Sequence, residues 1–328
     1  MIKPKVFVTR VILDQGMNLI CAFCDAEVWP GDLPPSREII LKRACGVDGL
    51  LCLLTDQIDG EIMDDIGPQL KVISNHAVGF DNIAVAAATA RGIPVGNTPG
   101  ILTEATADMA FALMLAAGRR IVAGDRAVRD GGWKTWRPSF MLGADFAGAT
   151  LGLIGFGRIG RAVARRAAGF GMHILFHDPQ PVTPESGMTA TPADLDTLLR
   201  ASDFVSIHTT LNDETRGLVD ASFLARMKPT AILINTARGA IVDQAALYEA
   251  LKARRIFAAG LDVADPEPLS LDSPLLTLDN LVLCPHIASA SWQTRARMSR
   301  MAAENLIAGL KGERLPNCVN PEVYAESR

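Results

Sequence analysis

Short apolar runs alternate along this chain with longer stretches of helix-forming residues. Four such runs lie in the first third, at 5–9, 50–54, 71–74 and 94–96, and six follow residue 150, at 151–154, 174–177, 204–208, 231–235, 258–262 and 281–284. Strands that are separated by helices need crossover connections, which are typical of parallel sheets covered by helices. The pattern predicts an α/β chain with two doubly wound parallel sheets.

The length of 328 residues also favours two domains. A long helix is predicted over 103–118 and a terminal helix over about 292–311, and the second of these is expected to return to the first sheet. The Pro/Gly-rich stretch 95–100 and residues 288–290 are predicted hinges. We therefore expect one domain from residues 1–100 and 290–328 and another from 101–289, around a cleft.

A glycine turn is the best-defined local motif. The apolar run 151–154 leads directly into Gly155-x-Gly157-x-x-Gly160, and a helix-forming stretch follows. In this arrangement the first glycine allows a tight turn, the second lets the backbone approach a pyrophosphate, and the third lets helix and strand pack closely. The phosphates would lie at the helix N-terminus. The motif predicts dinucleotide binding.

An acidic residue completes this motif. Asp178 ends the next apolar run, eighteen residues beyond Gly160. A carboxylate at this place accepts hydrogen bonds from the ribose 2′-hydroxyl and repels a 2′-phosphate. Pro179 and Gln180, which follow, supply no cation. NAD(H) is therefore the favoured cofactor, with NADP(H) as the alternative.

Three residues with complementary chemistry follow later apolar runs. Arg238, Glu267 and His286 each come shortly after a predicted strand, where doubly wound sheets bind ligands. An arginine fork matches a carboxylate, and a histidine can exchange a proton with a carbonyl oxygen. A carboxylate on the other ring nitrogen would fix the tautomer. Taken singly, the three could be a surface charge, a loop acid and a cap. Together they predict the reduction of a 2-oxo acid.

Charge and hydropathy exclude other classes of protein. The net charge of −4 provides no basic face for nucleic acid or an anionic membrane, and no apolar run reaches the roughly 20 residues that span a bilayer. The N-terminus enters a strand and not a signal peptide, so cytoplasmic residence is predicted. The spacing of the histidines and cysteines predicts no metal site.

Four segments together resemble the D-isomer-specific 2-hydroxyacid dehydrogenases: 155–160, 235–239, 260–269 and 285–289. Segments 49–56, 90–99 and 131–136 look like the glyoxylate/hydroxypyruvate reductase branch of that family. The resemblance covers essentially the whole chain. It implies a Rossmann-type cofactor domain, a flavodoxin-like substrate domain and a homodimer. Many members of the branch carry a basic pair where this chain has Asp178-Pro179, and this departure favours NADH over NADPH.

The resemblance also assigns roles to individual residues. It implies Arg238 as the carboxylate binder, His286 as the acid/base and Glu267 as its partner, and it adds the backbone of Val78 and Gly79 as a substrate contact from the other domain. The implied cofactor contacts, together with those of the glycine motif, are Thr106, Gly155, Gly157, Arg158, Ile159, Gly160, Asp178, Thr209, Thr236, Asp262 and Ala288.

These observations predict an NAD(P)H-dependent reductase of small 2-oxo acids, with glyoxylate and hydroxypyruvate favoured. A 2-ketogluconate reductase or another D-2-hydroxyacid dehydrogenase would keep the mechanism and change the pocket. A non-catalytic NAD-sensing protein or corepressor would keep the fold and lose turnover. The complete set of Arg238, Glu267 and His286 argues against the last alternative.

Overall fold

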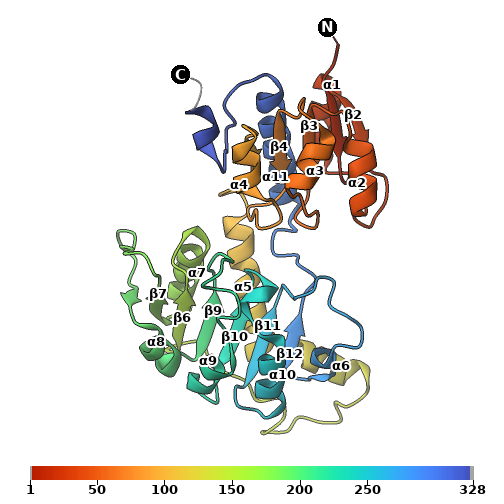
Figure 1. Cartoon of the computed structure of the whole chain (residues 1–328). Helices are drawn as coiled ribbons and strands as arrows, with labels where there is room; N and C mark the ends of the chain where they lie inside the picture. The colour runs from red at the N-terminus through yellow and green to blue at the C-terminus, as the bar shows by residue number, and fades with distance from the viewer. Residues whose placement is uncertain (1, 326–328) are drawn as a thin grey trace. The chain divides into compact units, whose positions relative to one another are not determined.

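The computed structural model describes residues 2–325, which form two compact units (Figure 1). Unit 1 contains the residues up to Leu102 together with those from Ala290 onward. Unit 2 is Thr103–Ser289. Each unit has its own parallel sheet and its own core, as the alternation of apolar runs and helices predicts.

Unit 1 contains a five-stranded parallel sheet in the order β2-β1-β3-β4-β5, which is the flavodoxin-like order (Figure 1). The strands are β1 (Lys5–Val8), β2 (Asp25–Val28), β3 (Gly49–Cys52), β4 (Val72–Asn75) and β5 (Val95–Gly96). The helices are α1 (Asp14–Phe23), α2 (Arg37–Ala44), α3 (Gly60–Ile66), α4 (Val85–Ala90) and α11 (Trp292–Leu310), followed by the 3₁₀ helix η3 (Pro321–Tyr324). Strands β3 and β4 are buried along their whole length because helices cover both faces.

Helix α11 packs against α1 and the sheet of unit 1, although it lies more than 200 residues away in the sequence. Ser291 caps its N-terminus by accepting a hydrogen bond from the Thr294 amide at 3.2 Å. The Ser74 hydroxyl of β4 donates to the Ala302 carbonyl at 2.8 Å. Close approach is possible because Gly309 faces Val72, where a Cβ would clash with the valine side chain. These contacts complete unit 1.

Unit 2 contains a seven-stranded parallel sheet in the order β12-β11-β10-β9-β6-β7-β8 (Figure 1). The strands are β6 (Thr150–Ile154), β7 (His173–His177), β8 (Thr191–Pro192), β9 (Phe204–Ile207), β10 (Ile232–Asn235), β11 (Ala258–Leu261) and β12 (Leu281–Leu283). The chain reverses its direction of winding between β6 and β9, as in a Rossmann fold. Ligands bind at this switch point in doubly wound sheets.

The helices of unit 2 cover both faces of its sheet (Figure 1). They are α5 (Thr103–Gly118), α6 (Ile121–Arg129), α7 (Arg158–Gly169), α8 (Leu195–Ala201), α9 (Ala221–Arg226) and α10 (Gln244–Lys252), with the 3₁₀ turns η1 (Gly239–Ile241) and η2 (Pro274–Thr277). Helix α5 has the bounds predicted from the sequence, and its buried face lies against α7, β10 and β11.

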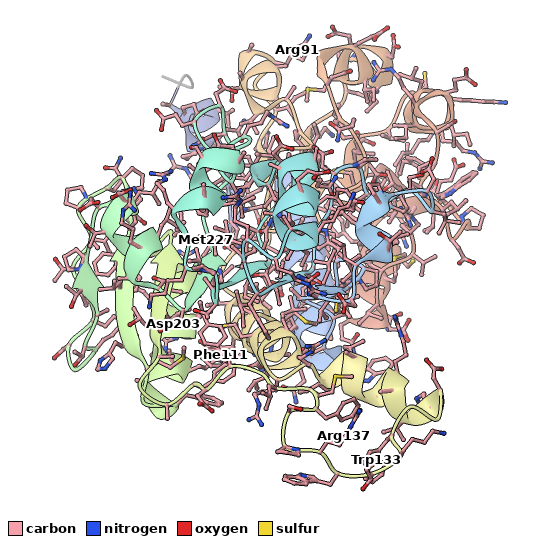
Figure 2. The ribbon with its side chains drawn as sticks, turned by 90° about the horizontal axis from the view of Figure 1, so that it is seen from below. Arg91, Phe111, Trp133, Arg137, Asp203 and Met227 are labelled. Carbon is pink, nitrogen blue, oxygen red and sulfur yellow. The ribbon has the colours of Figure 1, made fainter. Side chains whose placement is uncertain are left out.

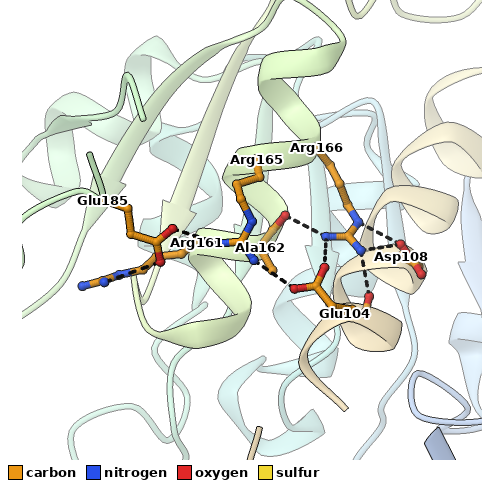
Figure 3. Close-up of polar contacts among 7 residues, drawn as sticks. All are labelled: Glu104, Asp108, Arg161, Ala162, Arg165, Arg166 and Glu185. Carbon is orange, nitrogen blue, oxygen red and sulfur yellow. Dashed lines mark hydrogen bonds and ion pairs between the residues drawn. The ribbon is translucent and has the colours of Figure 1, made fainter. Parts of the chain in front are cut away.

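An ion cluster ties α5 to α7 on the surface of unit 2 (Figure 3). Arg166 reaches both Glu104, at 2.9 Å, and Asp108, at 2.6 Å. Arg165 pairs with Glu104 at 2.9 Å and with Glu185 at 3.1 Å. The cluster holds the helix that follows the glycine turn to the first helix of the unit.

Two strands were not predicted from the sequence, β2 and β8. Strand β2 lies at one edge of its sheet with the polar sequence Asp-Ala-Glu-Val, and β8 is an exposed edge strand of two residues. Edge strands bury little surface, so they lack the continuous apolar run that marks the central strands.

Candidate active site

The glycine turn joins β6 to α7 as its sequence predicts. Gly155 has a φ of +88°, and a Cβ there would lie 2.7 Å from the His208 carbonyl atoms. A Cβ at Gly160 would overlap the Gly155 carbonyl, so helix and turn pack closely only with glycine. At Gly157, by contrast, a Cβ would meet nothing within 4 Å. The turn therefore presents an open face at the N-terminus of α7, beside Arg158 and Ile159.

Asp178 lies directly against this turn. One carboxylate oxygen accepts a hydrogen bond from the Phe156 amide at 2.8 Å, and the other accepts from the Gln180 amide at 3.0 Å. Each carboxylate oxygen has a second lone pair, which can accept from a hydroxyl group. Asp178 therefore fixes the turn and can still accept hydrogen bonds from a ribose.

The residues around the turn fit a dinucleotide. Thr236, at the end of β10, has a buried hydroxyl with no hydrogen-bond partner in the part of the chain that the structure describes. Such a group is costly unless a ligand or water satisfies it. Thr106 is buried in α5, and Thr209 follows the buried end of β9. The orphaned hydroxyl of Thr236 and the open face at Gly157 both suit a bound NAD(H).

His286 and Glu267 form a hydrogen-bonded pair in unit 2. The distance from His286 Nδ1 to Glu267 Oε2 is 2.7 Å, and the Ala264 amide donates to the other oxygen of Glu267 at 3.0 Å. About a quarter of each side chain is exposed. Because a carboxylate only accepts, Nδ1 carries the proton, and Nε2 is the ring nitrogen left to exchange a proton with a ligand.

The environment keeps Glu267 ionised. Burial acts to raise the pKa of its carboxyl group, but the hydrogen bond from His286, the Ala264 amide and the charge of Arg238 together hold that pKa below its usual value. An ionised Glu267 accepts the hydrogen bond from Nδ1 and orients the imidazole. The pair therefore leaves Nε2 as the ring atom that can exchange a proton.

His286 is held in a backbone conformation that side chains rarely adopt. Its φ is +55°, and its amide donates to the Asp262 carbonyl at 2.8 Å. The Asp262 carboxylate, which is fully buried, accepts from the amides of Ile287 and Ala288 at 2.8 and 2.7 Å. Burial raises the pKa of Asp262 despite these two amides. The end of β11 thus fixes the segment that carries the histidine.

Arg238 lies in the turn after β10, close to the loop that carries Glu267. The two segments touch because Gly239 lies against Ala264, where a Cβ would overlap the carbonyl. Asn235 shapes the turn: its side chain donates to the Arg238 carbonyl at 2.8 Å and accepts from the Ala237 amide at 2.9 Å. The structure therefore brings Arg238, Glu267 and His286 to one edge of the sheet of unit 2.

Val78 and Gly79 belong to unit 1, in the loop that follows β4. Both are partly exposed, and neither backbone amide donates to any described residue. Their carbonyl oxygens, by contrast, accept hydrogen bonds from the side chains of Asn97 and Asn75. The sequence analysis missed both asparagines. The available signal was a polar residue at the end of an apolar run.

A cavity lies elsewhere in unit 2. It has a volume of about 280 Å³ and is lined by α6, Arg254 and the segment leading into β12, and none of the predicted site residues borders it. No group of three or more His, Cys, Asp or Glu residues in the described chain could hold a metal ion. Within residues 2–325, no helix is long and apolar enough to cross a membrane.

Comparison with known proteins identifies the family. Residues 111–288 match the model of the D-isomer specific 2-hydroxyacid dehydrogenase, NAD binding domain. A glyoxylate reductase of Korarchaeum cryptofilum is 53% identical over 325 residues, which cover 98% of this chain and 97% of the relative. The chain belongs to the D-isomer-specific 2-hydroxyacid dehydrogenases. The family and the fold class predicted from the sequence are confirmed.

Solved structures of this dehydrogenase family agree with that assignment. The TT0316 protein of Thermus thermophilus superposes with a TM-score of 0.91 at 46% identity, over 96% of this chain and 99% of that one. An NADPH-dependent glyoxylate/hydroxypyruvate reductase of Sinorhizobium meliloti, solved with NADP and malonate, has a TM-score of 0.84 at 32% identity, over 97% of both chains. The predicted cofactor class, NAD(H) with NADP(H) as the alternative, is consistent with these relatives.

Proposed function

We propose that this dehydrogenase reduces small 2-oxo acids to 2-hydroxy acids, with glyoxylate and hydroxypyruvate as substrates and NADH as the favoured cofactor. The observation that carries the proposal is the 2.7 Å hydrogen bond between His286 and Glu267, in the same unit as Arg238 and the glycine turn. The glyoxylate reductase of K. cryptofilum supports the substrate class.

Arg238 binds the substrate carboxylate in this proposal. Its guanidinium group presents paired N–H donors in a plane, which match the two oxygens of a carboxylate. The amides of Val78 and Gly79 are proposed as further donors to the same carboxylate, since no described residue accepts from them. Binding the carboxylate fixes the position of the neighbouring carbonyl group.

His286 then donates the proton from Nε2 to the carbonyl oxygen of the substrate. Reduced nicotinamide, when bound, supplies the hydride for the carbonyl carbon. Glu267 accepts a hydrogen bond from the Nδ1–H group, so it holds the ring in place before and after the transfer. The 2-hydroxy acid carries both the hydride and the proton, and the imidazole is left neutral.

The preference for NADH is proposed from Asp178. Its carboxylate would accept from the ribose hydroxyls, and a 2′-phosphate would meet a negative charge there. Pro179 and Gln180, which follow, offer no cation to compensate. Thr106, Thr209, Thr236, Asp262 and Ala288 are proposed as the remaining cofactor contacts, and Asp262 would hold the nicotinamide amide.

A homodimer is proposed from an exposed apolar surface of unit 2. Helix α6 buries none of its residues, and the side chains of Ile121, Val122, Val128, Trp133, Trp136 and Leu142 are 45–79% exposed. Figure 2 shows Trp133 and Arg137 on the loop that follows α6. An apolar surface of this kind is typical of a protein interface, and sedimentation of the protein tests it. Cytoplasmic location and the absence of nucleic-acid binding stay predictions.

An assay panel tests the proposed function. NADH and NADPH are each combined with glyoxylate, hydroxypyruvate, pyruvate and 2-ketogluconate, and nicotinamide oxidation is followed at steady state. We expect the highest kcat/KM with NADH and glyoxylate or hydroxypyruvate. Tight binding of NADH with negligible turnover of all four acids would instead indicate a sensor. A clear preference for 2-ketogluconate would indicate a 2-ketogluconate reductase.

A further inference from the structure

Three consecutive peptide groups in the loop after β4 are held by their carbonyl oxygens. The Ala77 carbonyl accepts from the Thr98 amide at 2.9 Å. The Val78 carbonyl accepts from Asn97 Nδ2 at 2.8 Å, and the Gly79 carbonyl accepts from Asn75 Nδ2 at 2.9 Å. In a planar trans peptide, the N–H points opposite to the C=O. The next three amides, those of Val78, Gly79 and Phe80, are therefore directed away from the groups that hold the loop.

Those amides have no acceptor of their own in residues 2–325. Successive backbone N–H groups that face one region form a concave donor surface for an anion. The orientation depends on Asn75 and Asn97, because side-chain carboxamides and not a strand partner hold two of the three peptides. Without these two carboxamides, the peptide groups of the loop would be free to rotate.

Asn75 is also fixed in a wider network. Its Nδ2 donates to Asn82 Oδ1 at 3.0 Å, and its Oδ1 accepts from the Cys52 thiol at 3.7 Å. Asn82 Nδ2 in turn donates to the carbonyls of Leu53 and Asp56, each at 3.0 Å. Both asparagines are buried. Each amide nitrogen faces only acceptors, so the direction of every hydrogen bond is determined.

The network joins the ends of two neighbouring strands. Leu53 and Asp56 belong to the loop after β3, and the Asp56 carboxylate accepts from the Leu53 amide at 2.7 Å and from the Thr9 hydroxyl at the end of β1. The loop that carries Val78 and Gly79 is thus tied through Asn75 and Asn82 to two other strand ends in unit 1. This fixes the donor surface before any ligand binds, which lowers the entropic cost of binding.

We infer that Asn75 is a positioning residue for substrate binding: by holding the Gly79 carbonyl, it fixes the Gly79–Phe80 peptide group, which continues the row of amides from Val78 and Gly79 that are proposed to donate to the substrate carboxylate. The inference rests on the proposed function, since it assumes a carboxylate substrate. Asn75 itself touches no reacting atom in this scheme. Its effect should appear in substrate affinity, because the carboxylate is bound equally in the ground and transition states.

The test compares two buried asparagines of unit 1. Asn75→Asp keeps the shape of the side chain but cannot donate to Gly79 or Asn82. Asn320→Asp is the matched control, because Asn320 is equally buried and its Nδ2 donates to the Ile93 carbonyl and the Thr89 hydroxyl, away from the loop. If either aspartate variant does not fold, the same comparison is made with Asn75→Ser and Asn320→Ser.

For Asn75→Asp we expect KM for glyoxylate to rise about 10-fold, the scale of one weakened hydrogen bond to a charged group, with kcat within about 3-fold. The dissociation constant of oxamate, measured by calorimetry on the NADH-saturated protein, should rise by the same factor. NADH binding should not change. The Asn320 variants should lose thermal stability but keep KM and oxamate affinity.

An Asn75 variant that folds and keeps the wild-type KM and oxamate affinity would overturn the inference, as would an equal loss in the Asn320 variants. Failure of the proposed function gives a different result. In that case the wild-type protein turns over no 2-oxo acid, while oxamate binding and its dependence on Asn75 still report on the loop. Absence of oxamate binding to the wild-type protein would count against both.

Discussion

The two sheets of this protein use their carboxyl edges in different ways. In unit 2, the edge carries ionisable side chains, and His286 and Glu267 are paired at 2.7 Å with about a quarter of each exposed. In unit 1, the loop after β4 presents backbone amides, which are held by the buried, uncharged carboxamides of Asn75 and Asn97. In the proposed function, strand ends thus supply a proton donor and a charged anion binder in unit 2, and uncharged anion donors in unit 1.

The difference follows from what each task requires. A group that transfers protons must present the right ring nitrogen to its ligand, so it needs a partner that orients it, which is the role proposed for Glu267 beside His286. A group that only binds an anion can keep a fixed dipole, and a backbone amide has no alternative protonation state. Variants in the two units should therefore affect different steps.

The largest effect is expected at the proposed proton donor of unit 2. His286→Ala removes the proposed general acid, so kcat should fall by about 10²-fold or more, while NADH binding stays near the wild-type value. Single-turnover kinetics and a fluorescence titration with NADH measure the two quantities. A variant with wild-type kcat would show that the proton comes from another group and would remove the contrast between the units.

The next effect concerns stability and tests unit 1. His76 follows Asn75, and its Nε2 lies 3.1 Å from Ser299 Oγ. Burial, with the charge of Arg295, lowers the pKa of His76 from 6.5 to about 4. The unfolded chain therefore takes up a proton below pH 6.5 that the folded protein resists until about pH 4. This contribution to stability is complete above pH 6.5 and is lost as the pH falls towards 4.

Because of His76, we expect the free energy of unfolding to fall by about 2 kcal/mol between pH 7 and pH 5, since one pKa unit is worth roughly 1.4 kcal/mol. Denaturant unfolding at the two pH values measures it. His76→Gln should abolish this part of the pH dependence, whereas His173→Gln, which removes an exposed imidazole, should leave it in place. If the stability of His76→Gln depended on pH in the same way as that of the wild-type protein, the loss would come from other groups and not from His76.

The sequence predicted most of what lies in the centre of each sheet. Continuous apolar runs marked ten strands, and the helix-forming stretch from Thr103 to Gly118 marked α5. The glycine turn could be predicted because two of its reasons are local: Gly155 has a φ of +88°, and a Cβ at Gly160 would clash with the Gly155 carbonyl within the same motif. Local constraints of this kind are visible in a sequence.

The missing parts depend on contacts between distant segments. Asn75 and Asn82 are ordinary polar residues in the sequence, and their role appears only once the loops after β3 and β4 lie side by side. The pairing of His286 with Glu267 could be suspected from the residue types, but the contact of Gly239 with Ala264 that brings Arg238 close to Glu267 could not. The type of a residue shows which hydrogen bonds it can make, but its actual partners depend on which distant segments the fold brings together.

A smaller effect should separate charge from geometry in unit 2. Arg238→Lys keeps the positive charge but replaces the planar fork with a single ammonium group, so KM for glyoxylate should rise about 10-fold. Steady-state kinetics at saturating NADH measures it. If Arg238→Lys kept the wild-type KM, a positive charge alone would be enough to hold the carboxylate. Unit 2 would then bind the anion by charge, and unit 1 by the direction of its backbone amides.

The smallest effect is expected where charges are most concentrated, in the ion cluster of α5 and α7 (Figure 3). The side chain of Glu104 is 62% exposed although it pairs with both Arg165 and Arg166. Water already stabilises such charges, and exposed pairs contribute only about 0.2–1 kcal/mol. Glu104→Gln should therefore lower the unfolding free energy by less than about 1 kcal/mol, and added salt should shrink the difference further. A larger or salt-independent loss would mean that the cluster is shielded from solvent. Solvent exposure would then no longer distinguish these surface charges from the His286–Glu267 pair of unit 2.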